Sequence, residues 1–137
     1  MEPLISIQLF DHLPAYRPGD VLKCDYQIDA VAEGEIQAVE ASVLWYTEGK
    51  GDEDIGVHFF ERRMPADVEE GDLRPLKSFS TPLPNSPLTY VGQILTVHWC
   101  VRVRAFLRQG RESFMDYPFR LGDQLNGVNN ESDAAIG

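Results

Sequence analysis

The sequence is poor in the residues that build metal centres and catalytic sites. Its 137 residues include two cysteines and three histidines, and these form no Cys-x-x-Cys, His-x-Glu or His-x-x-x-His spacing. It also lacks a Gly-x-Ser-x-Gly elbow and a glycine-rich phosphate loop. We therefore expect no enzyme activity, no metal and no cofactor. His98 and Cys100, two residues apart, are interpreted as an exposed polar pair rather than as metal ligands.

Positive charge is scarce as well. Twelve lysines and arginines face 22 aspartates and glutamates, a net charge of −10, which argues against a nucleic-acid binder that works by bulk charge. No apolar run is long enough to span a bilayer, and the first residues lack the pattern of a signal peptide. With only two cysteines, these features predict a cytoplasmic protein without a transmembrane segment.

What the sequence has in quantity is alternation of apolar and polar residues with period two, which is typical of β-strands. Helical periodicity is hard to find. We expect strands over 4–9, 21–28, 36–46, 57–63, 76–81, 95–105 and 113–121. Seven or eight strands with one apolar face each predict an all-β fold, a two-sheet antiparallel β-sandwich of immunoglobulin-like or arrestin-like type. This domain spans residues 1–122, and the polar segment 123–137 is expected to be a disordered tail.

Cys24, Trp45 and Cys100 imitate the spacing of an immunoglobulin disulfide around a buried tryptophan. The direction of the side chains opposes that interpretation. Cys24 lies on the apolar side of its strand, whereas Cys100 alternates with the apolar residues Trp99 and Val101 and so points away from them. Thiols on opposite sides of a sheet cannot bond, and we expect both to be free.

Two stretches together resemble the arrestin family, in particular its amino-terminal sandwich. One is Tyr16-Arg17-Pro18-Gly19-Asp20-Val21. The other is Pro87-Leu88-Thr89-Tyr90-Val91-Gly92, followed by a long strand that contains Trp99. The resemblance covers about residues 3–121. It implies an arrestin-like fold and a protein-binding scaffold or adaptor without catalysis of its own.

The residues of these motifs have physical reasons independent of any family, so we interpret them as structural. Pro18 and Gly19 suit a tight turn into a strand, and Gly92 leaves room for the ring of Tyr90. The set comprises Tyr16, Pro18, Gly19, Pro87, Tyr90, Gly92 and Trp99. Two departures from the family matter: Lys23-Cys24-Asp25 stands where a glycine is usual, and the chain has room for one sandwich instead of two. A homodimer could supply the second.

The most informative polar feature is basic. Arg102, Arg104 and Arg108 share one face of the predicted strand 95–105 and its continuation, with Arg111 just beyond. Pairing with acids of a neighbouring strand is the favoured interpretation, and recognition of an acidic peptide by bidentate arginines is the alternative.

The leading functional hypothesis is a non-catalytic adaptor that binds a protein or peptide, acidic or extended, for instance as a strand added to a sheet edge. Proline residues around 82–87 would protect one such edge. The second hypothesis is a sandwich that binds a carbohydrate or another small molecule through Tyr46, Phe60 and Trp45.

Overall fold

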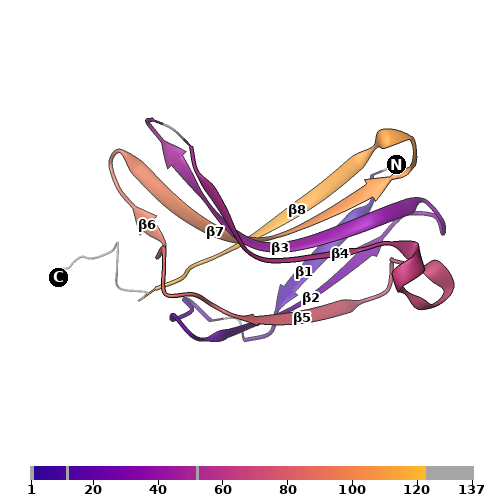
Figure 1. The fold of residues 1–137 in the computed structure, drawn as a ribbon, viewed down its shortest axis with the longest axis horizontal. Coiled ribbons are helices and arrows are strands. Elements are labelled where there is room, and N and C mark those ends of the chain that lie inside the picture. Colours follow the sequence, from indigo (N-terminus) through magenta and orange to yellow (C-terminus); the bar gives the residue numbers. More distant parts are fainter. Residues whose placement is uncertain (1, 12, 52, 123–137) are drawn as a thin grey trace.

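The computed structural model describes residues 2–11, 13–51 and 53–122 and consists of two facing antiparallel sheets (Figure 1). The smaller sheet has the order β1 (Leu4–Leu9), β2 (Val21–Asp29) and β5 (Lys77–Pro82). The larger sheet places β4 (Ile55–Arg63), β3 (Ile36–Gly49) and β7 (Leu95–Leu107) side by side. On the far side of β7 lie both β6 (Tyr90–Val91) and β8 (Glu112–Phe119). The predicted β-sandwich is confirmed.

The described residues contain no α-helix. Three short 3₁₀ turns, Pro65–Asp67, Glu69–Gly71 and Arg108–Gly110, are the helical elements found there. No helix in these residues could therefore cross a membrane. The predicted tail over 123–137 lies outside the described residues.

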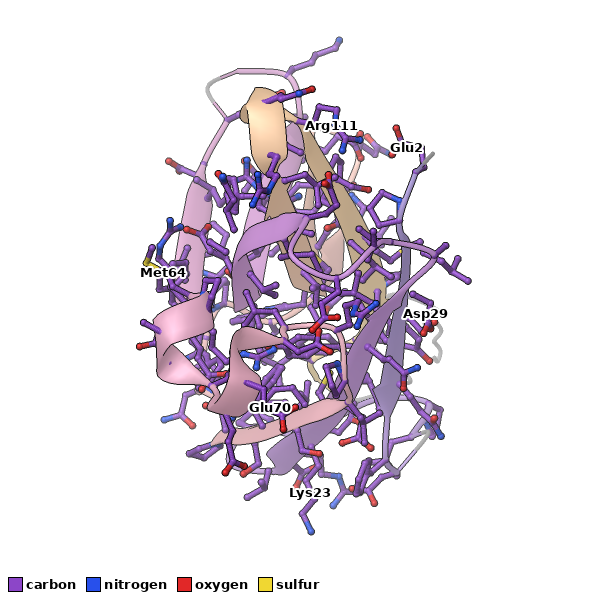
Figure 2. The ribbon with its side chains drawn as sticks, turned by 90° about the vertical axis from the view of Figure 1, so that its right-hand side faces the viewer. Glu2, Lys23, Asp29, Met64, Glu70 and Arg111 are labelled. Atoms are coloured by element: carbon purple, nitrogen blue, oxygen red, sulfur yellow. The ribbon has the colours of Figure 1, made fainter. Side chains whose placement is uncertain are left out.

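The core lies between the inner faces of the two sheets, as the alternation predicts. β3 and β7 contribute Val39, Ala41 and Val43 together with Trp99 and Val101, all buried. β2 covers them from the smaller sheet with every second residue from Leu22 to Ile28. Figure 2 shows side chains filling the space between the layers, with the charged Lys23 and Asp29 of β2 at the periphery.

The proline-rich segment after β5 carries the chain from the smaller sheet to the larger one. Pro82 ends β5, which is an edge strand, and the chain reaches β6 in the larger sheet at Tyr90. The position of these prolines at a sheet edge matches the expectation, because proline cannot donate to a central ladder. The two-residue strand β6 was not predicted, since two residues are too few for alternation to be seen.

Strict alternation fails in β4. The register of β4 against β3 shifts between Val43 and Leu44, so that Phe59 is paired with Val43 but Val57 is paired with Leu44. The extra residue of this β-bulge is His58. Regular alternation over 57–63 would put Val57 and Phe59 on one face, but Val57 is exposed, and Phe59 stacks on Phe79 of β5 with ring centroids 4.6 Å apart.

The larger sheet is strongly bent. In Figure 1 the left-hand ends of β3 and β7 rise away from the smaller sheet, whereas Ile36 at the start of β3 and Leu107 at the end of β7 belong to the core together with Ile28 of β2. We call the surface of the larger sheet that faces away from the core the outer face. It is formed by the residues of β4, β3, β7 and β8 that alternate with the core residues.

Candidate interaction surface

The outer face carries three arginines, and each is paired with an acid. Arg102 makes two bonds to Asp116 of β8, from Nε to Oδ1 at 2.7 Å and from Nη2 to Oδ2 at 3.0 Å. Arg104 is paired with Glu112 of β8. The hydrogen bond to Asp116 raises the pKa of Arg102 above its usual value, so this residue is charged at every physiological pH.

On the other side of β7, the third arginine belongs to β4. Arg62 donates from Nη1 to Oε2 of Glu40 at 2.5 Å. A fourth carboxylate, that of Glu48, accepts from Nε2 of His98 at 2.9 Å. The strands of the outer face therefore hold three arginines and four carboxylates, those of Glu40, Glu48, Glu112 and Asp116. The surface is thus close to neutral, in a chain whose net charge is −10.

Aromatic rings are interleaved with the arginines. Arg62 and Arg104 both lie over the ring of Phe106, at 5.5 and 5.3 Å from its centroid, and Arg102 lies 5.7 Å from that of Phe114. Such cation–π contacts are favourable and keep the guanidinium groups in place. Phe114 itself is exposed to solvent.

The floor of the outer face is apolar and buried. Leu44 and Cys100 are directly paired across β3 and β7, and Ser42 lies two residues along. The expectation that Cys100 is exposed beside His98 is wrong, because Cys100 lies on a central strand between Leu44 of β3 and Pro118 of β8 and is 2% exposed. Burial raises the pKa of Cys100 to about 12. Both Cys24 and Cys100 are free thiols.

Val57 and Phe60 of β4 stand exposed beside this floor. Further along, at the end of the outer face, is a hollow of about 300 Å³, whose lining includes Arg62, Met64, Phe106 and Arg111. The surface therefore combines a hollow large enough for a side chain with arginines and aromatic rings that can contact that side chain.

The structure places the predicted arginines in two groups. Arg102 and Arg104 lie together on the outer face, but Arg108 does not continue their row, because β7 ends at Leu107 and Arg108 begins a 3₁₀ turn. Its Nε donates to the carbonyl of Gly34 at 3.0 Å. Arg111 pairs with Glu35 at 3.2 Å. The expectation of one face with period two is wrong at Arg108.

The residues of the first motif form a tight turn. The amide of Asp20 donates to the carbonyl of Arg17 at 3.0 Å, and Gly19 has a φ of +89°, as the third residue of a type II turn requires. Tyr16 is buried before this turn. Its ring meets that of Phe119 edge-on, with centroids 5.7 Å apart.

In the second motif, Nε1 of the buried Trp99 donates to the carbonyl oxygen of Pro87 at 2.7 Å. A Cβ atom at Gly92 would lie 2.4 Å from the ring of Tyr90, so the ring occupies the space above the glycine. Leu121 joins the two motifs: its amide donates to Oγ1 of Thr89 at 2.8 Å, and it forms a parallel bridge with Tyr16. Sequence reasoning did not identify this junction.

The rings named in the small-molecule hypothesis do not share one surface. Tyr46 lies on the outer face and stacks on His98, with centroids 4.9 Å apart, and Phe60 lies on the same face. Trp45 is packed against the core from the inner face. In the part of the chain that the structure describes, no three His, Cys, Asp or Glu side chains gather as a metal site would require.

Comparisons with known proteins support the fold. No family model matches the sequence, and no curated protein matches it. Among solved structures, the chain is similar to Spo0M, the sporulation control protein of Bacillus subtilis, with a TM-score of 0.63 over 88% of this chain and 13% sequence identity. This likeness supports the arrestin-like fold that the two motifs imply. The aligned part is 49% of the Spo0M chain, so this chain spans about half of that protein's length.

Proposed function

We propose that this protein is a non-catalytic, cytoplasmic binding module that recognises another protein through the outer face of its larger sheet. The observation that carries this proposal is the pairing of arginines with aromatic rings on a nearly neutral surface of an otherwise acidic molecule. Arginine and aromatic residues are enriched in protein interfaces and in their energetic hot spots.

The partner segment expected here presents an apolar side chain next to a carboxylate. The apolar group would contact the exposed side chains of Phe60 and Val57. The carboxylate would accept from a guanidinium such as that of Arg102, whose orientation Asp116 fixes. A pre-oriented arginine loses little conformational entropy on binding, which favours affinity.

Two further facts support the proposal. Spo0M is named a sporulation control protein, and a regulatory role for this chain would not require catalysis. The two thiols are free and lie in different sheets, which suits a reducing compartment.

The proposal is tested by photo-cross-linking in the native cell. A photoreactive phenylalanine is placed at Phe60, and in a matched control at Phe10, which follows β1 and is as exposed, 50% against 53%. We expect a defined partner to be cross-linked from position 60, and the yield to fall when Arg102→Ala is added. A partner cross-linked equally from both positions, or from position 10 alone, would disprove the assignment to the outer face.

A further inference from the structure

The outward edge of β8 carries no strand within the described residues, since β8 is paired with β7 alone. Charged residues usually guard such edges. Here the two acids of the strand, Glu112 and Asp116, are drawn back over the sheet by Arg104 and Arg102 of β7. Between them, Phe114 and Met115 are exposed on opposite sides of the strand. The edge is therefore neutralised and apolar.

The other edges are less open to pairing. β4 carries the bulge at His58, and the carbonyl of Pro82 accepts from Nε2 of this histidine at 2.6 Å, which links β4 to β5. An ion pair between Lys77 and Glu61 closes the same side of the sandwich. β1 has an open edge but is only six residues long, and its exposed residues after Leu4 are Ser6 and Gln8.

We propose that β8 pairs antiparallel with β8 of a second copy of this chain, about a twofold axis at Met115. Residues directly opposite each other in a sheet point to the same face of that sheet. In a symmetric antiparallel pair of β8 strands, one residue therefore lies opposite its own copy, and the twofold axis passes through that residue. An axis at Phe114 would set Glu112 opposite Asp116 of the other copy, and an axis at Asp116 would set two aspartates opposite each other. Like charges in direct opposition are unfavourable. An axis at Met115 avoids both and pairs Glu112 to Pro118, whereas an axis nearer either end of β8, such as Ser113 or Tyr117, pairs fewer residues of the strand.

In this register Asp116 lies opposite Phe114 of the second copy, and Ser113 lies opposite Tyr117. The pairing uses Glu112 to Pro118 and ends before Arg120, whose carbonyl accepts from the amide of Tyr16 in the same chain. The larger sheets then form one continuous ten-stranded sheet, and the two outer faces lie side by side. The dimer does not depend on the proposed function, but it would double the binding surface.

The association is tested by sedimentation equilibrium of the full chain. We expect twice the monomer mass of 15.5 kDa. Met115→Lys would place two like charges together at the axis and is expected to give a monomer with an unchanged circular dichroism spectrum. The matched control is Met64→Lys, labelled in Figure 2, because Met64 follows the opposite edge strand β4 and is equally exposed, 47% against 42%.

Two variants test the register itself. Chains with Met115→Lys and chains with Met115→Glu are expected to be monomeric alone and to form a heterodimer when mixed. Met115→Cys is expected to oxidise to a covalent dimer, whereas Ser113→Cys is not, because its opposite residue is Tyr117. A wild-type chain that is monomeric at every concentration would overturn the proposal. A dimer that survives Met115→Lys, or equal cross-linking by both cysteines, would overturn the assignment to β8.

Discussion

The hydroxyl group of Tyr16 gives a sharp test of the packing. Tyr16 and Tyr26 are each 1% exposed, yet their hydroxyls differ. That of Tyr26 accepts from Nε of Arg63 at 3.3 Å, whereas that of Tyr16 has no hydrogen-bond partner among the described residues. Burial raises the pKa of Tyr16, so its hydroxyl is neutral at pH 7 and the comparison concerns hydrogen bonding alone.

Tyr16→Phe removes a buried hydroxyl and leaves the ring and its edge-on contact with Phe119 in place. A buried, unpaired hydroxyl costs about 1–3 kcal/mol. We therefore expect the variant to be more stable by about 1 kcal/mol or more, which raises Tm by about 4 °C in a domain of this size. Tyr26→Phe removes an acceptor from the partly buried guanidinium of Arg63 and is expected to lose about 1 kcal/mol.

Urea unfolding followed by tryptophan fluorescence measures both changes. The reasoning would be refuted if Tyr16→Phe lost stability, because the hydroxyl would then have a partner. It would also be refuted if the two variants changed the free energy of unfolding by the same amount.

Three more predictions concern stability and are measured by the same unfolding assay. Trp99→Phe leaves the carbonyl of Pro87 without its donor and should cost about 2–4 kcal/mol; a loss below the cost of one hydrogen bond would contradict that contact. Gly49→Ala should cost at least about 2 kcal/mol, since φ is +145° and the new Cβ would lie 2.1 Å from a carbonyl oxygen. Burial raises the pKa values of Cys24 and Cys100 from 9.0 to about 12, so the folded state holds these two protons more tightly than the unfolded state. The stability that this difference contributes is complete below pH 9 and is lost between pH 9 and 12, where the free energy of unfolding falls by up to about 4 kcal/mol per thiol. The double alanine variant should lose less over that range, and an identical alkaline profile would contradict this.

The fold was predictable because each sheet buries one face. Period two in β2, β3 and β7 assigns Tyr26, Val43 and Val101 to the core, where the structure has them. The same alternation separates Cys24 from Cys100 and so correctly opposes a disulfide. These predictions need only local sequence, because the pleat fixes the direction of each side chain.

The details of the candidate site were less accessible. The partners of Arg102 and Arg104 depend on the register of β8, which the turn at Arg108 and Gln109 determines. The burial of Cys100 depends on its neighbours across the sheet, Leu44 of β3 and Pro118 of β8. A bulge such as the one at His58 leaves no mark in the alternation that distinguishes it from a regular strand. Each of these is a property of neighbouring strands rather than of one segment.

The central claim is that recognition takes place on the outer face of the larger sheet. It is tested most directly by calorimetric titration of the cross-linked partner, once purified, against the wild type, Phe60→Asp and Phe10→Asp. We predict at least a tenfold loss of affinity for Phe60→Asp, as for a hot-spot residue of about 1.4 kcal/mol or more, and little change for Phe10→Asp. Unchanged affinity in Phe60→Asp, with a loss in Phe10→Asp, would contradict the account.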